Sequence, residues 1–220
     1  MTERFAPFAD LIDPDRALSI LRDAVAGADD GELFLERARS ETLVFDDGRL
    51  RNAGYDASQG FGLRAVRGEV TGYAHSTEIT EAALRDAAAM ARLAVGNGGH
   101  VLAPAPAGPG PRLYTDADPV EGLAFGDRIA TLRDIDAYAR DLDPRVVQVT
   151  ASLASSLQEI AILRPEGGLA TDIRPMARLN VSVIVESNSR RESGNAGGGG
   201  REPGVILLLA DDADGDRHIG

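Results

Sequence analysis

Alternating hydrophobic and polar residues predict that much of this chain is β-strand. The clearest run covers residues 179–185, where leucine and valine occupy every second position and Asn180 and Ser182 lie between them. This period of two is typical of a strand with one buried face. Asp46-Asp47-Gly48 and Arg67-Gly68 are turn sequences that would join neighbouring strands into hairpins. We expect strands over residues 32–45, 61–66, 69–75, 147–153, 160–163 and 169–186.

Three other segments have the spacing of amphipathic helices. The first, 14–26, follows Asp13-Pro14, which is a favourable helix start. The second, 80–95, begins at Thr80 and ends before Gly96, and the third covers 127–142. Hairpins flanked by helices predict an α+β fold, a mainly antiparallel sheet with helices on one face.

A linker divides this pattern into two parts. Residues 103–111 read APAPAGPGP, a sequence that neither a helix nor a strand interior accommodates. We therefore expect an N-terminal α+β unit over 1–103 and a linker over 104–120. A second α+β segment over 121–201 would end in a glycine-rich loop. A divergent tail, non-native or disordered, would follow over 202–220.

Composition narrows the possible functions. The chain has 220 residues and a net charge of −12, which argues against nucleic acids and anionic membranes as partners because both need a basic surface. It has no cysteine, which excludes disulfides and thiolate metal sites. Its N-terminus does not resemble a signal peptide, and the longest apolar run, 205–210, is too short to cross a bilayer. We expect a cytoplasmic protein.

The stretch that follows the strand at 169–186 combines arginines with four consecutive glycines. Glycine allows close approach of another backbone, and arginine binds carboxylates through two parallel hydrogen bonds. A phosphate-binding loop would need lysine and a hydroxyl residue directly after the glycines, but Arg201 and Glu202 follow. The alternative is that the arginines are solvated and neutralise nearby glutamates. The candidate peptide-contacting or channel-loop residues are Arg190, Arg191, Gly197, Gly198, Gly199, Gly200 and Arg201.

Several short motifs occur in a fixed order along the chain. They are Ser-Glu-x-Leu at 40–43, Asp-Gly-Arg at 47–49, Gln-Gly-x-Gly at 59–62, Thr-Gly-x-Ala-x-Ser at 71–76 and Asp-x-Arg-Pro-x-x-Arg-Leu-Asn at 172–180. Each motif alone is weak. Together, over residues 10–201, they resemble the N-terminal portion of the TldD/PmbA metallopeptidases.

This resemblance implies a subunit that works with a related subunit of the same family to shorten small peptides. In that family, zinc is bound by a His-Glu-x-x-x-His motif in the C-terminal half. This chain has no such motif, and His75, His100 and His218 are isolated from one another. We therefore expect an N-terminal fragment with no catalytic or metal-binding residue, inactive alone, with zinc only in the missing C-terminal half.

A second function remains open. The chain would then be a stand-alone binding or assembly module that pairs with a peptidase subunit or holds an extended peptide. The resemblance does not distinguish a zinc-bearing subunit from a metal-free one.

Overall fold

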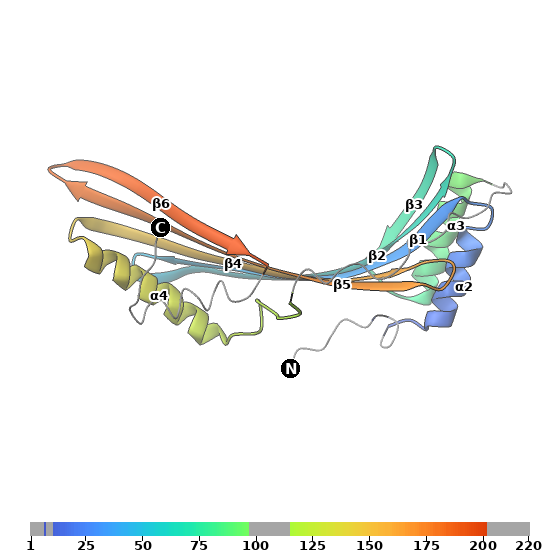
Figure 1. The fold of residues 1–220 in the computed structure, drawn as a ribbon, viewed down its shortest axis with the longest axis horizontal. Helices are drawn as coiled ribbons and strands as arrows, with labels where there is room; N and C mark the ends of the chain where they lie inside the picture. Colours follow the sequence, from blue (N-terminus) through green and yellow to red (C-terminus); the bar gives the residue numbers. More distant parts are fainter. Residues whose placement is uncertain (1–6, 8–10, 97–114, 202–220) are drawn as a thin grey trace.

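A computed structural model describes residue 7 and residues 11–96 and 115–201. Its described residues form one six-stranded antiparallel sheet in the order β3-β2-β1-β4-β5-β6 (Figure 1). The strands are β1 (Asp30–Asp46), β2 (Arg49–Arg67), β3 (Val70–Ser76), β4 (Val146–Leu163), β5 (Leu169–Ser187) and β6 (Arg190–Gly200). The helices are α2 (Pro14–Ala24), α3 (Glu81–Val95) and α4 (Phe125–Leu142). The expected α+β fold is confirmed.

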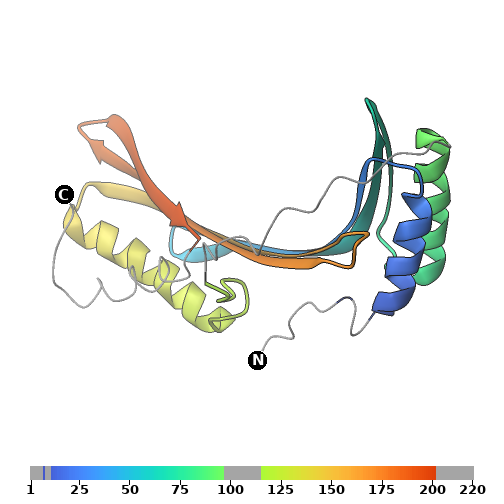
Figure 2. The ribbon, with the colours of Figure 1, turned by 45° about the vertical axis from the view of Figure 1, so that its right-hand side comes forward.

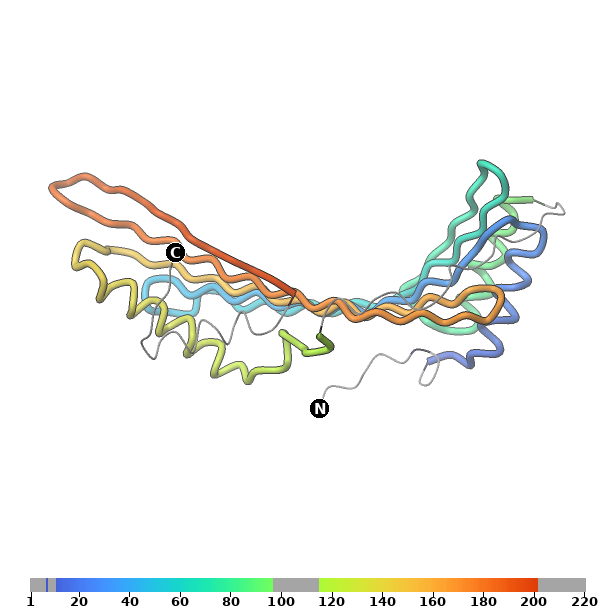
Figure 3. The backbone as a smooth tube through the Cα atoms, viewed as in Figure 1, coloured from blue at the N-terminus to red at the C-terminus, as the bar shows by residue number. Residues whose placement is uncertain are grey.

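Four of the strands are unusually long. β1, β2, β4 and β5 have 17, 19, 18 and 19 residues, whereas most strands in globular proteins have 3–10. Figure 3 shows them running through the whole length of the molecule. The sheet is bowed, with α2 and α3 outside one end and α4 outside the other (Figure 2). All three helices therefore lie on the convex face.

Local sequence explains where two of the helices begin. The Asp13 carboxylate accepts a hydrogen bond from the Arg16 backbone N–H at 2.8 Å, and Pro14 occupies the first turn of α2. The Thr80 hydroxyl accepts the Ala83 backbone N–H at 3.2 Å at the start of α3. Gly96 ends α3 with a φ of 67°, a conformation that favours glycine. α4 has no side-chain cap at Ala124.

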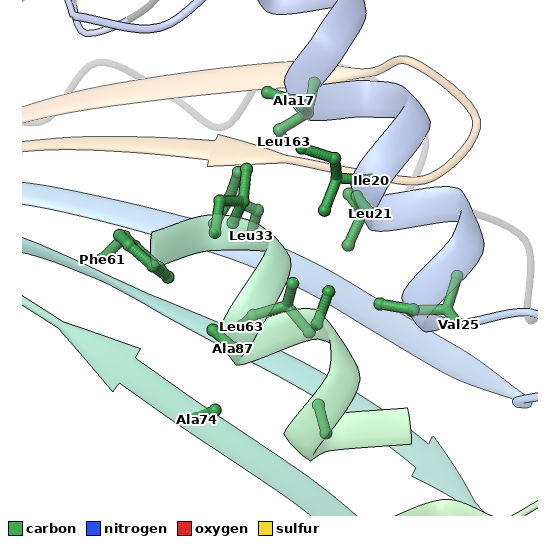
Figure 4. Close-up of a cluster of buried hydrophobic side chains, with 14 of the residues drawn as sticks. Ala17, Ile20, Leu21, Val25, Leu33, Phe61, Leu63, Ala74, Ala87 and Leu163 are labelled. Carbon is green, nitrogen blue, oxygen red and sulfur yellow. The ribbon is translucent and has the colours of Figure 1, made fainter. Parts of the chain in front are cut away.

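Two separate apolar cores lie on the convex face. At one end, Leu33 and Leu35 of β1 pack with residues of β2, β3, α2 and α3, including Leu21 and Leu63 (Figure 4). At the other end, Leu43 and Phe45 pack with Leu132 of α4 and with residues of β4 and β5. The odd-numbered residues of β1 thus serve both cores, because alternate side chains of a strand point to the same face.

A belt of charged side chains separates the two cores. Arg37, Arg39 and Glu41 are the three odd-numbered residues of β1 between Leu35 and Leu43, and Glu159 of β4 lies beside them. Arg37 contacts the Glu159 carboxylate at 2.9 Å, and Arg39 contacts it at 3.5 Å. Most of these side chains are buried, so each charge needs a partner. We call this group, with the partners described next, the charged belt.

The remaining partners in the charged belt come from the segment before α4. Arg39 pairs with Asp118 at 3.2 Å and with Glu121 at 2.9 Å. The other Asp118 oxygen accepts two backbone N–H groups of the turn that follows, at 2.8 and 3.1 Å. Arg128 of α4 pairs with Glu41 at 2.7 Å and also donates to the Val120 carbonyl. The charged belt therefore attaches α4 and the turn before it to the middle of β1.

Three predictions from the sequence are wrong in detail. Residues 147–153 and 160–163 are not two strands of a hairpin but parts of the single strand β4. Residues 49–60, for which no strand is predicted, form the first part of β2. Gly197, Gly198, Gly199 and Gly200 are not in a loop but in the edge strand β6. The polar and small residues in these segments resemble turn sequence, but hydrogen bonds to a neighbouring strand hold each segment extended.

The predicted boundary between two units remains a prediction. β1, before the linker, pairs with β4, after it, so the residues on both sides share one sheet. The linker at 104–120 lies mostly outside the described residues, and the tail at 202–220 lies entirely outside them.

The glycines of β6 differ in their surroundings. A Cβ atom at Gly197 would lie 2.5 Å from the Asn180 side-chain oxygen and 2.8 Å from the Leu179 carbonyl oxygen. At Gly199, it would lie 2.7 Å from the Ala177 carbonyl oxygen. At Gly198 it would have no described atom within 4 Å. Packing within the described chain thus accounts for Gly197 and Gly199 but not for Gly198.

We expect Gly197→Ala and Gly198→Ala to have opposite effects on stability. Gly197→Ala should lower the free energy of unfolding by about 1–3 kcal/mol, because a backbone carbonyl cannot move away from the new methyl group. Gly198→Ala should raise it by up to about 1 kcal/mol by restricting the unfolded chain. Urea unfolding of the two variants provides the comparison, and equal losses would contradict the packing described for β6.

The charged belt predicts a non-additive pair of substitutions. Arg128→Met should destabilise the protein by about 3–5 kcal/mol, because it leaves the Glu41 carboxylate buried without its partner. Arg128→Met combined with Glu41→Leu should recover most of this loss, since no unpaired charge remains. Arg190→Met, at a side chain that is 81% exposed, is the control and should change stability by less than about 0.5 kcal/mol. A double variant as unstable as Arg128→Met would show that the ion pair is not the reason for the loss.

Candidate functional site

The concave face of the sheet carries no helix among the described residues (Figure 2). A depression of about 270 Å³ lies on it, near the middle of the long strands. We call this depression the trough. Its lining residues are Ala38, Arg39, Ser40, Asp56, Ser156, Leu157, Gln158, Arg174, Met176 and Arg201.

The trough is built from side chains that strand pairing places in two adjacent rows across the sheet. The first row runs Asp56, Ser40, Ser156, Met176, and the second runs Ser58, Ala38, Gln158, Arg174. Arg201 lies next to the first row, because it follows Gly200, which pairs with Ala177. Directly opposed side chains in such a row are about 5 Å apart at Cβ. Small residues therefore form the floor, and larger ones form the two walls.

The two walls of the trough carry opposite charges. Asp56 of β2 stands on one side, and Arg174 and Arg201 stand on the other. Arg174 also pairs with Asp172 at 2.6 Å, but both side chains are nearly half exposed, and such pairs contribute little to stability. Gln158 on the floor donates its amide N–H to Glu36 at 2.8 Å, which leaves its carbonyl oxygen as an acceptor.

The structure brings only part of the predicted site to this trough. Arg201 lines it, whereas Arg190 and Arg191 lie at the far end of β6, roughly 33 Å away at about 3.3 Å per residue. Those two arginines pair with Glu192 and Glu186, each at 2.7 Å. The seven candidate residues therefore do not form one site, and the role proposed for them from sequence remains untested.

Sequence analysis missed the residues that form the rest of the trough. Asp56, Ser40, Ser156 and Arg174 come from four strands. Ser40 and Arg174 lie in two different motifs, and no motif contains more than one of the four residues. The feature that these four residues share is their position in the strand alternation: all are even-numbered, so their side chains lie on the face opposite to the apolar residues. That signal becomes usable only when strand register is known.

The charged belt is a second cluster of titratable groups, and it differs from the trough in its environment. Burial raises the pKa of the Glu41 carboxyl group, and the nearby Arg128 partly opposes that shift. A raised carboxyl pKa is common in active sites. However, Glu41 lies on the face covered by α4 and is paired with a helix residue. We therefore assign it to the stability of the fold.

The described residues do not fit a zinc ion. Catalytic zinc needs three protein ligands, and within these residues no group of three or more His, Cys, Asp or Glu side chains is placed to hold a metal. His75 is the histidine in the described part of the chain, and its ring stacks on Tyr73 with centroids 5.8 Å apart. No described helix has the length and hydrophobicity needed to cross a membrane.

Comparison with protein families gives two adjacent matches. Residues 31–95 match the PmbA/TldA metallopeptidase domain 1, and residues 118–216 match the PmbA/TldA metallopeptidase central domain. The second match includes most of the segment after residue 201.

Individual relatives agree with these matches. A metalloprotease TldD homologue from Haemophilus influenzae is 37% identical over 79% of this chain, and one from Buchnera aphidicola subsp. Schizaphis graminum is 34% identical over 87%. These matches cover 36% and 40% of those proteins, so the chain spans about two fifths of their length.

A solved structure supports the fold. The crystal structure of TldE from Thermococcus kodakarensis has a TM-score of 0.67 with this chain at 14% identity, and the match covers 90% of this chain and 46% of that one. The sequence matches and this shared fold agree, and the chain belongs to the PmbA/TldD metallopeptidase family.

Proposed function

We propose that this chain is the N-terminal, non-catalytic portion of a TldD/PmbA-type zinc metallopeptidase subunit that processes peptides in the cytoplasm. The observation that carries the proposal is the pair of matches to the first and central domains of that family. The described residues also lack a ligand set that would hold the zinc ion. In this proposal, zinc and the catalytic base belong to the remaining part of the subunit.

The fold suggests what this portion contributes. Its long strands, joined by the charged belt, form a continuous scaffold with one face uncovered by described helices. An uncovered sheet face suits contact with a related subunit of the family or with an extended peptide. The same observation favours the second candidate function, a stand-alone module that pairs with a peptidase subunit or holds a peptide.

Zinc binding and peptide cleavage test the proposal together. The purified chain should retain less than one zinc ion per molecule after gel filtration and should not cleave an unstructured peptide when zinc is added, because its described residues supply no three-ligand site. Mass spectrometry of the peptide and metal analysis of the protein provide the two readouts.

Cleavage that a chelator abolishes would contradict the proposal. His75→Ala is the informative variant in that case, because loss of both zinc and cleavage would place His75 in a metal site. If the variant retains both zinc and cleavage, His100 and His218 are the next residues to substitute.

A further inference from the structure

We propose that two copies of this chain associate through the free edge of β2, so that their sheets join into one across a two-fold axis at Gly54. The partner is a second copy of this chain, and the contact is an edge-to-edge pairing of strands. This inference goes beyond the proposed function, which names neither a second copy nor an edge of the sheet. It does not depend on the peptidase assignment.

The first part of β2 is an unprotected edge strand. β3 pairs with β2 only between Phe61 and Arg67, so residues 49–59 have no strand on that side among the described residues. All eleven of these residues are exposed. Backbone N–H and C=O groups on such an edge are available to another strand. Natural edge strands are commonly protected by lysine or proline, and residues 49–59 contain neither.

The length of this free edge suits pairing with its own copy. The edge is bounded by the turn at Asp47-Gly48 and by the start of the β3 pairing at Phe61. Gly54 is its centre, with residues 49–53 on one side and 55–59 on the other. An antiparallel copy centred on Gly54 therefore covers the whole edge and ends where β3 begins. The apolar cluster under α4 includes no residue of 49–59, so α4 leaves this edge open.

Side chains near the centre of the edge match their own copy. Pairing of β2 with β1 is regular from Asn52 onward, so alternate residues share a face. With the axis at Gly54, Asn52 lies opposite Asp56 of the second copy on the concave face, where the amide can donate a hydrogen bond to the carboxylate. Ala53 lies opposite Tyr55 on the other face, and Gly54 opposes itself. The axis produces each match twice, and moving it to Ala53 or Tyr55 would lose the match of Asn52 with Asp56.

The other free edge of the α4 end is less suited to a specific contact. β6 ends in four glycines, and a glycine-rich strand has few side chains that could fix the register of a partner. We therefore assign the contact to β2.

Sedimentation velocity of the full chain over a range of concentrations tests the proposal. The unsubstituted chain should change reversibly from monomer to dimer. Gly54→Lys should weaken this association by about tenfold or more, because the axis places two ammonium groups opposite each other. The monomer should accommodate the substitution, since the nearest atom to a Cβ at Gly54 is the Asn52 side-chain nitrogen, at 4.0 Å.

Gly198→Lys is the matched control, because it places the same charge in the edge strand β6. A Cβ atom at Gly198 also has room, with no described atom within 4 Å. This variant should associate as the unsubstituted chain does. Equal thermal midpoints for the variants, measured by circular dichroism, would show that a loss of association is not a loss of folding.

A mixture of two variants tests the position of the axis. Gly54→Glu alone should also associate weakly, because two carboxylates would be opposed. An equimolar mixture of Gly54→Lys and Gly54→Glu should associate about tenfold more tightly than either variant alone, since each lysine then faces a glutamate.

A disulfide provides a readout that does not depend on charge. The chain has no cysteine, so a single introduced thiol can link only to its own copy. Gly54→Cys should form a disulfide-linked dimer on mild oxidation, because opposed residues of an antiparallel pair have Cα atoms about 4.5–5.5 Å apart, within the range of a disulfide. Gly198→Cys is the control and should remain mostly unlinked.

Three results would overturn the proposal. The first is a chain that stays monomeric at every concentration. The second is association of Gly54→Lys as tight as that of the unsubstituted chain, which would place the contact elsewhere. The third is a mixture of the lysine and glutamate variants that associates no more tightly than each variant alone, which would show that residue 54 does not oppose itself.

Discussion

The arrangement of this molecule depends on ion pairing in the middle of one strand. Arg37, Arg39 and Glu41 are charged residues on the face that elsewhere carries the apolar cores, and their partners come from β4, α4 and the turn before α4. Alternation alone would allow β1 and β4 to slip by two residues and still bury their apolar faces. Such a slip would place buried charges among leucines, at a large cost in free energy. The charged belt therefore specifies the register.

This register determines what lies on the opposite face. The same β1–β4 pairing that brings Arg37 beside Glu159 aligns Ser40 with Ser156 in the floor of the trough. A defect in the charged belt would therefore alter the trough, because Arg39 belongs to the belt and also lines the trough. The ion pairs hold in register the strands that carry the other trough residues.

The sequence predicts the fold class, the three described helices and most turns, because these follow from short-range patterns. Asp13, Thr80 and Gly96 act where capping rules place them. The errors share a physical origin. One example is the polar stretch Ser155, Ser156, Gln158 and Glu159, which is typical of a turn but lies within β4. Ser155 and Glu159 face the charged belt, whereas Ser156 and Gln158 face the trough.

Local patterns identify polar residues but not their partners across a sheet. For that reason, Arg201 was the only trough residue among the site residues predicted from sequence, found because it adjoins the glycines. Asp56 became visible only through the pairing of distant strands, and that pairing also shows that Arg174 of the 172–180 motif lies beside the same depression.

Joining β1 to β4 has a further consequence, which concerns how the chain folds. Contacts between these strands and the residues that flank them join positions 102 to 134 residues apart in sequence. Contacts between such distant positions slow folding, because a long loop must close before they form. During synthesis, β1 and β2 can form their hairpin early. The other edge of β1 cannot form its hydrogen bonds until β4 has been synthesised. Until then, that edge of β1 is exposed to other chains, and during this interval the protein is most prone to misassembly.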